Sequence, residues 1–186
     1  MLMRVITGTA RGRKLLTPDG TDIVRPTSEK VKEAIFSAIQ FDIEGRRVLD
    51  LFAGSGQLGI EALSRGAASA VFVDSSSTSL GVVKKNLEAT GLLEYASVIS
   101  GDYSSYLLRC NQQFDIVFLD PPYKSGFLLD ALTKIAPQLS DYGFVFCEHP
   151  TGALMPETVS GLKIKRTYKF GTVSVTMYIK DVTDDE

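Results

Sequence analysis

A glycine-rich turn between a short apolar stretch and a helical pattern constrains the fold of this chain more than any other feature. The stretch Arg46-Arg47-Val48-Leu49 leads into Asp50-Leu51-Phe52-Ala53-Gly54-Ser55-Gly56-Gln57-Leu58-Gly59-Ile60-Glu61-Ala62-Leu63. Gly54, Gly56 and Gly59 satisfy the pattern G-x-G-x-x-G, in which a strand runs into a tight turn and then a helix. Such a unit is typical of an open α/β sheet that binds its ligand at the carboxyl ends of the strands.

The acids around this turn distinguish two classes of cofactor. The pyrophosphate of a dinucleotide binds amides at a helix N-terminus, and nearby anions would repel it. Here Asp50 precedes the turn and Glu61 lies just inside the helix, which suits a cofactor that carries an ammonium group and a sulfonium. S-adenosylmethionine (SAM) carries both. We therefore predict a SAM site made by Asp50, Phe52, Gly54, Ser55, Gly56, Gly59 and Glu61.

Two further acids follow the next apolar stretches. Asp74 ends the run Ala70-Val71-Phe72-Val73, and Asp102 follows residues 96–100 with Tyr103 beside it. We expect Asp74 to bind the ribose hydroxyls of the cofactor. We expect Asp102 to accept the adenine amino group, with Tyr103 near the ring. Taken singly, each acid is more typical of an ordinary strand end, but their recurrence after successive strands favours a cofactor site.

The tetrapeptide Asp120-Pro121-Pro122-Tyr123 predicts a stiff loop that offers hydrogen-bond acceptors. It follows residues 114–119, an apolar run typical of a buried strand. Each proline fixes its own φ, lacks an N–H and pushes the preceding residue toward extended geometry. The Asp120 carboxylate and nearby carbonyls can hold both hydrogens of an exocyclic amino group while Tyr123 stacks on the base. A loop that merely ends a strand is the alternative, and the cofactor motif upstream argues against it.

With both motifs, the chain resembles the RsmD-type 16S ribosomal RNA guanine methyltransferases over nearly its whole length. The resemblance rests on Arg4-Val5-Ile6-Thr7-Gly8 with Gly12-Arg13-Lys14-Leu15, on Arg25-Pro26-Thr27-Ser28 with Val31-Lys32-Glu33-Ala34-Ile35-Phe36, and on the glycine turn with Glu61-Ala62-Leu63-Ser64-Arg65-Gly66-Ala67. The loop at Asp120 is similar to amino-methyltransferases more broadly. Asp74 departs from the family, which more often has glutamate there, and so do Ser75-Ser76-Ser77 and the acidic tail.

The resemblance implies SAM-dependent methylation of the 2-amino group of a guanine in small-subunit ribosomal RNA. The target base would be turned out of its stack, with Asp120, Pro121, Pro122 and Tyr123 as the catalytic residues. An adenine amino-methyltransferase acting on DNA or RNA, or one acting on a glutamine side chain, stays open because all three substrates present a conjugated nitrogen. An inactive SAM-fold module that serves as an RNA-binding assembly factor is the alternative from another class.

The distribution of charge is more informative than the net charge of −2. Residues 1–17 carry four basic residues and no acid, whereas residues 181–186 carry four acids. The basic residues could equally form a solvated face, and the resemblance favours RNA contact. We predict RNA binding by Arg4, Arg11, Arg13, Lys14, Arg25 and Lys30. The small size of the chain leads us to expect 16S RNA in an assembled or assembling small subunit as the partner.

The remaining patterns predict one Rossmann-like α/β methyltransferase domain over residues 1–186. It consists of a basic N-terminal β-hairpin extension (1–24), a catalytic core (25–180) with a mostly parallel sheet, and an acidic tail (181–186). We expect a helix over residues 28–40 capped by Thr27 or Ser28, another marked by Leu128, Ala131, Leu132, Ile135 and Leu139, and an antiparallel hairpin of residues 162–170 and 173–179.

The remaining candidate groups predict a cytoplasmic protein without a metal or a membrane segment. No apolar run is long enough for a membrane span, and the chain start has no signal-peptide core. Cys110 and Cys147 lie in unrelated segments, so we expect reduced thiols. His149 is the single histidine, and we expect it to be structural.

Overall fold

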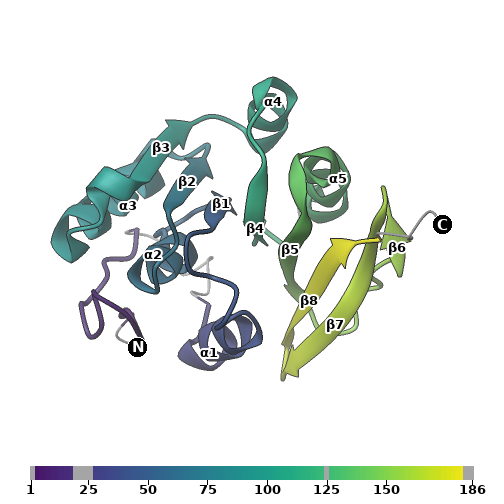
Figure 1. Cartoon of the computed structure of the whole chain (residues 1–186), viewed down its shortest axis with the longest axis horizontal. Helices are drawn as coiled ribbons and strands as arrows, with labels where there is room; N and C mark the ends of the chain where they lie inside the picture. Colours follow the sequence, from purple (N-terminus) through teal and green to yellow (C-terminus); the bar gives the residue numbers. More distant parts are fainter. Residues whose placement is uncertain (1–2, 19–26, 124–125, 182–186) are drawn as a thin grey trace.

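The computed structural model describes residues 3–18, 27–123 and 126–181. Its centre is one sheet with the strand order β3-β2-β1-β4-β5-β8-β7-β6 (Figure 1). The strands are β1 Arg47–Leu51, β2 Ser69–Asp74, β3 Ala96–Ser100, β4 Phe114–Leu119, β5 Leu139–Pro150, β6 Thr158–Val159, β7 Leu162–Phe170 and β8 Val173–Lys180. The first five strands in this order, β3, β2, β1, β4 and β5, are parallel to one another. The sheet continues through β8, β7 and β6, each antiparallel to the strand before it. The predicted α/β class, the mostly parallel sheet and the C-terminal hairpin are confirmed.

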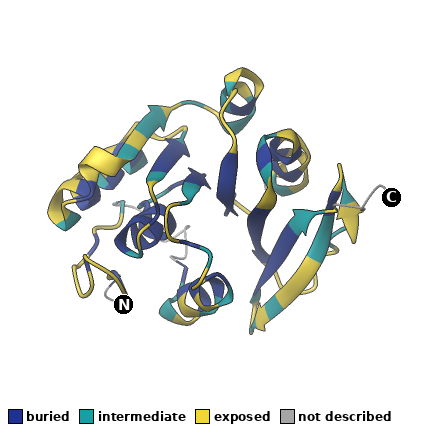
Figure 2. Ribbon diagram, viewed as in Figure 1, coloured by how far each residue is buried: buried dark blue, intermediate teal, exposed yellow. Residues whose placement is uncertain are grey.

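Helices cover both faces of the parallel part of the sheet. They are α1 Glu29–Ala38, α2 Gln57–Ser64, α3 Ser77–Thr90, α4 Tyr103–Arg109 and α5 Phe127–Ile135, with short 3-10 helices at Leu93–Tyr95 and Ala136–Gln138. Helices α1, α2 and α3 share one apolar cluster with one face of the sheet, and α4 and α5 share a second cluster with the opposite face. Strands β1, β2 and β4 between them are almost wholly buried (Figure 2), as expected for parallel strands, whereas the edge strand β3 has no buried residue.

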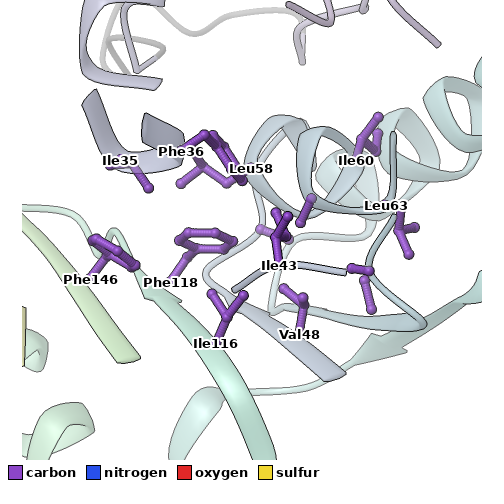
Figure 3. Packing of buried hydrophobic residues seen from close by; sticks show 14 of the residues in the cluster. Ile35, Phe36, Ile43, Val48, Leu58, Ile60, Leu63, Ile116, Phe118 and Phe146 are labelled. Atoms are coloured by element: carbon purple, nitrogen blue, oxygen red, sulfur yellow. The ribbon is translucent and has the colours of Figure 1, made fainter. Parts of the chain in front are cut away.

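Helix α1 begins and packs as its sequence predicts. The Ser28 hydroxyl accepts a hydrogen bond from the Val31 amide, so Ser28 is the N-cap. Ile35 and Phe36 point toward the sheet, and the Phe36 ring lies 5.7 Å from that of Phe118 (Figure 3). Burial of these large side chains fixes α1 beside the end of β4, where the Asp120 loop begins.

The N-terminal segment pairs as a short form of the predicted β-hairpin. It doubles back through one isolated bridge between Arg4 and Lys14, with the Val5 amide donating to the Arg13 carbonyl at 2.9 Å. No regular strand forms in its described residues 3–18. The Leu15 amide also donates to the Met3 carbonyl and the Gly12 amide to the Val5 carbonyl, both at 2.9 Å. Its buried apolar side chains join the cluster shared by α1 and α2, so backbone hydrogen bonds and packing together hold this segment; they are Met3, Val5, Ala10 and Leu15.

The helix after the Asp120 loop ends earlier than the sequence predicted. Leu139 begins β5, whereas its spacing had placed it on the helix. Pro137 lies between them in the 3-10 turn, and a proline removes the N–H that would continue the helix. Leu139 is nevertheless buried in the same cluster as α5, which explains why its helical spacing was misleading.

Candidate active site

Acidic side chains lie along the carboxyl edge of four neighbouring strands. Asp74 ends β2, Asp50 lies near the end of β1, Asp120 follows β4 and Glu148 lies near the end of β5. Between β1 and β4 the strand order reverses, and open α/β sheets bind ligands at such a switch point. The order of the strands therefore brings four acids from distant parts of the sequence to one edge.

The glycine turn leaves open space at Gly54. Gly54 has a φ of +58°, and no atom lies within 4 Å of the position that a Cβ would take there. Its amide donates to one Asp74 oxygen at 2.9 Å, and the Ser76 amide donates to the other at 2.8 Å. These two bonds orient the Asp74 carboxylate, and each oxygen keeps a second acceptor position for a ligand hydroxyl.

Asp50 is buried beside the turn with one strong hydrogen bond. Its Oδ2 accepts from the Gly59 amide at 3.0 Å. Burial raises the pKa of Asp50 to about 7, and the charge of Asp74 adds to this shift. A bound cation would offset both the desolvation of the Asp50 carboxylate and its repulsion by Asp74. The two carboxylates and the space at Gly54 therefore fit a cofactor with an ammonium group and a ribose.

Two of the predicted cofactor glycines have packing roles. A Cβ on Gly59 would lie 2.3 Å from the Phe72 ring, and one on Gly56 would lie 3.2 Å from Val83. Gly59 is therefore required for close contact between α2 and β2. The direction of this missing Cβ assigns Gly59 a packing role, and contact of its main chain with the cofactor stays a prediction.

Glu61 also lies away from the cofactor side. Its carboxylate is fully buried and accepts from the amides of Ile6 and Thr7 at 2.8 and 3.0 Å. It also pairs with Arg65 at 2.9 Å and lies 3.7 Å from the Lys32 ammonium. The prediction that Glu61 faces the cofactor is wrong. Glu61 instead anchors the N-terminal segment to α2 and α1.

Phe52 and Tyr103 form an aromatic cluster with Phe127. The Phe52 and Tyr103 ring centroids are 5.0 Å apart, and Tyr103 and Phe127 are 5.2 Å apart. Phe52 has a φ of +73°, an unusual value for a residue with a large side chain. Asp102 caps α4 by accepting from the Ser105 amide at 3.0 Å. The cluster thus places aromatic faces beside the glycine turn, with Asp102 at the end of β3.

The loop after β4 presents Asp120 without a described partner. Asp120 is half-buried, and no hydrogen bond or ion pair among the described residues reaches its carboxylate. Burial raises its pKa well above the ordinary value, and the charges of Glu148 and Asp50 raise it further. A partly buried carboxyl group without a described protein partner is suited to a ligand that brings its own hydrogen-bond donors.

Glu148 is a site residue that the sequence reasoning missed. Its Oε1 accepts from the Tyr123 hydroxyl at 2.9 Å, and its Oε2 accepts from the Thr27 hydroxyl at 3.1 Å. Burial raises the pKa of Glu148, and the two hydroxyls oppose that shift. The signal was available, because Glu148 is an acid after the apolar run of residues 144–147, as Asp74 is after the apolar run of residues 70–73.

A cavity of about 220 Å³ lies beside this loop. Pro121, Pro122, Tyr123 and Glu148 line one part of it, and the first turn of α5 with residues 153–156 lines the rest. Leu154 at its rim is 99% exposed. His149 also lines it, but both ring nitrogens bond to the protein, at the Pro150 carbonyl and the Thr176 hydroxyl. This is the structural role expected of His149.

The described basic candidates lie on the N-terminal segment and at the start of α1. Arg11, Arg13, Lys14 and Lys30 are exposed, whereas Arg4 pairs with Glu29 at 2.9 Å. Arg25 lies outside the described residues, as do residues 19–24 of the predicted extension and 182–186 of the tail. Asn86 connects this segment to the glycine turn, because its amide nitrogen donates to the carbonyls of Leu16 and Ser55 at 3.0 and 2.9 Å.

Other site classes find no support in the part of the chain that the structure describes. Those residues contain no group of three or more acids, cysteines or histidines that could hold a metal. No helix within the described ranges is long and apolar enough to cross a membrane. Cys110 and Cys147 are free thiols.

Comparisons with known proteins cover nearly the whole chain. Residues 3–179 match the model of a family described as Conserved hypothetical protein 95. The chain is 43% identical to YlbH of Bacillus subtilis (96% of this chain, 99% of that protein). It is 33% identical to ribosomal RNA small subunit methyltransferase D of Escherichia coli K12 (96% and 90%). The solved structure of yhhF from Escherichia coli is similar with a TM-score of 0.86 at 31% identity (97% and 98%).

Proposed function

Since this chain belongs to the RsmD-type family, we propose that it transfers a methyl group from SAM to the 2-amino group of a guanine in 16S ribosomal RNA. Methylation of small-subunit ribosomal RNA is the function in the name of the Escherichia coli relative. The main support for the proposal is that the acids at the ends of β1 and β2 lie next to the Asp120 loop, at the point where the strand order reverses.

The residues of the edge divide into two groups in this proposal. Asp74 holds the ribose hydroxyls, Asp50 faces the ammonium, and the space at Gly54 admits the cofactor backbone. Phe52, Ser55, Gly56, Asp102 and Tyr103 complete that site, with Asp102 and Tyr103 toward the adenine. When bound, SAM supplies an electrophilic methyl group on a sulfonium.

Asp120 and the Pro121 carbonyl act on the target base. They accept the two amino hydrogens, which directs the nitrogen lone pair out of conjugation with the ring. Tyr123 stacks on the base, and Pro122 keeps the loop stiff. The rate enhancement comes from positioning and electrostatics, without a covalent intermediate.

The test of the proposal is a map of modified guanines. Ribosomal RNA from cells with and without this protein is digested and analysed by mass spectrometry, and the purified protein is then given labelled SAM and small subunits. The proposal expects one 2-methylguanine of 16S RNA to vanish without the protein and to reappear in the labelled reaction. A methylated adenine, or a methylated glutamine in a protein, would assign the alternative activities. SAM binding without any transfer would favour the inactive assembly factor.

Gly54→Ala should weaken SAM binding by about tenfold or more while the fold survives. The added Cβ points into the space that the cofactor backbone would occupy, and overpacking of this kind costs about 1–3 kcal/mol. Gly91→Ala is the matched control, because Gly91 has a similar φ of +72° and open space at the C-terminus of α3. Calorimetry should show weaker SAM binding for Gly54→Ala alone. Equal binding by both variants would remove the turn from the cofactor site.

The double variant Arg11→Ala, Arg13→Ala should bind RNA more weakly and with a shallower salt dependence. Each lost phosphate contact reduces the slope of log K against log salt by about 0.7–0.9. The double variant Lys165→Ala, Lys169→Ala changes the net charge equally on β7, where both lysines are also exposed. A slope that falls equally in both variants would indicate long-range charge and not contact by the N-terminal segment.

The same salt series should compare naked 16S RNA with protein-bound small subunits as substrates. We propose faster methylation of the protein-bound form, because a domain of this size has little surface with which to choose one guanine by itself. Equal rates on both substrates would contradict the assembled-subunit proposal.

A further inference from the structure

Glu148 lies directly beside Asp120 on the neighbouring strand. Strands β4 and β5 are parallel, with Phe118 opposite Phe146 and Leu119 opposite Cys147. Asp120 follows Leu119 and Glu148 follows Cys147, and the two acids are close enough for the charge of Glu148 to raise the pKa of Asp120. Because side chains alternate along a strand, both acids extend toward the face on which Phe118 and Phe146 contact each other. The register thus places two carboxyl groups next to one another at the active edge.

This pair is costly for the fold, which makes a purely structural role a poor explanation. Glu148 is only 6% exposed, and each acid lies where burial disfavours its charge. Among the described residues, no lysine, arginine or histidine forms an ion pair with either acid. Like charges held together without a cation repel each other, so an apolar residue at position 148 would stabilise the fold better.

The contacts of Glu148 orient it as an acceptor. The hydroxyls of Tyr123 and Thr27 each donate to a different oxygen, at 2.9 and 3.1 Å. Each carboxylate oxygen can accept a second hydrogen bond. Since Tyr123 is the ring expected to stack on the target base, its bond to Glu148 places this carboxylate at the edge of that ring. Glu148 also lines the cavity beside the loop.

We propose that Glu148 is a specificity-determining residue that accepts the N1–H of the target guanine while Asp120 accepts its 2-amino group. This inference rests on the proposed guanine methylation and deepens it. The Watson–Crick edge of guanine presents two adjacent donors, N1–H and the 2-amino group, and two adjacent carboxyl groups match them. Adenine presents a lone pair at N1, which a carboxylate repels. Enzymes that extrude a base read this edge by hydrogen bonds.

The probe for this inference is 2-aminopurine, which keeps the 2-amino group of guanine but has a lone pair at N1. It replaces the target guanine in 16S RNA that is ligated from synthetic pieces and assembled with ribosomal proteins. The wild type should prefer guanine over 2-aminopurine in kcat/KM by about 100-fold or more, because a site built around a hydrogen bond strongly rejects the analogue that lacks it.

Glu148→Gln should narrow this preference to about tenfold or less, because a glutamine amide can donate to N1 of 2-aminopurine. The preference is a ratio within one protein sample, so a smaller folded fraction does not change it. Glu157→Gln is the matched control, since it makes the same carboxylate-to-amide change at an exposed acid that does not line the cavity. Its preference should stay near that of the wild type.

Three results would overturn the inference. They are equal rates of the wild type on both bases, an unchanged preference in Glu148→Gln, and the same narrowing in Glu157→Gln, which would show that the preference does not depend on Glu148. Failure of the wild type to methylate guanine at all is a different result. It would refute the proposed function, and the inference with it.

Discussion

Replacement of Asp120 by asparagine should lower the turnover number by about 100-fold or more, the effect seen when one preorganised electrostatic partner is removed. The asparagine keeps the size of the side chain but replaces one acceptor oxygen with a donor, which faces the amino group of the base. SAM affinity should change little, because Asp120 faces the target base in the proposed mechanism. Rapid-quench assays with labelled SAM measure the first quantity and calorimetry the second. Unchanged turnover would mean that Asp120 only shapes the loop.

The same variant should be more stable than the wild type at neutral pH. Burial and the charges of Glu148 and Asp50 raise the pKa of Asp120 in the folded chain. Below about pH 3.9, the ordinary pKa of aspartate, Asp120 is neutral in both the folded and unfolded chains, so its ionisation costs no stability. As the pH rises toward 7, the unfolded chain releases this proton first, and the wild type loses stability relative to the variant. Urea titrations measure the free energy of unfolding of both proteins at each pH. The same pH dependence of this free energy in both would contradict the raised pKa of Asp120 beside Glu148 and Asp50.

Glu61→Gln should lower the free energy of unfolding by about 3–5 kcal/mol, the usual cost of breaking a buried ion pair by removing one partner. The variant leaves Lys32 buried with the Arg4 carbonyl at 2.7 Å as its remaining close acceptor. It also turns an amide NH₂ toward the N–H group of Ile6 or of Thr7, because each of these donates to a different Glu61 oxygen. Chemical denaturation measures the loss, and hydrogen exchange should show faster exchange at the amides of residues 5–15.

The control for this prediction is Glu29→Gln, which removes the exposed partner of Arg4. Exposed ion pairs contribute little to stability, so this variant should unfold near the wild type. The folded fraction of Glu61→Gln should keep its SAM affinity, because Glu61 lies away from the glycine turn. A large loss of SAM affinity in a stable Glu61→Gln protein would restore Glu61 to the cofactor site.

The sequence by itself determined the elements whose patterns are local. The glycine turn after β1, the Ser28 cap and the hairpin of β7 and β8 formed where the sequence predicted them. Each depends on a short-range requirement, such as a positive φ, a hydroxyl near a free amide or alternation along a strand. The strand-end rule also placed Asp50, Asp74 and Asp120 at one edge, because parallel strands end on the same side of the sheet.

Only the tertiary structure decided which segment covers the buried face of a helix and which residues lie opposite each other on neighbouring strands. Glu61 was misplaced because every residue of α2 is buried, and periodicity cannot reveal that the N-terminal segment covers the outer side of this helix. Helix α4 was not predicted, since its seven residues are too few for a clear pattern. The position of Glu148 at a strand end was visible in the sequence, but its proximity to Asp120 was not, because that depends on the register of β4 and β5. Such pairings join residues far apart in the chain, and the free energy of packing the whole sheet selects them.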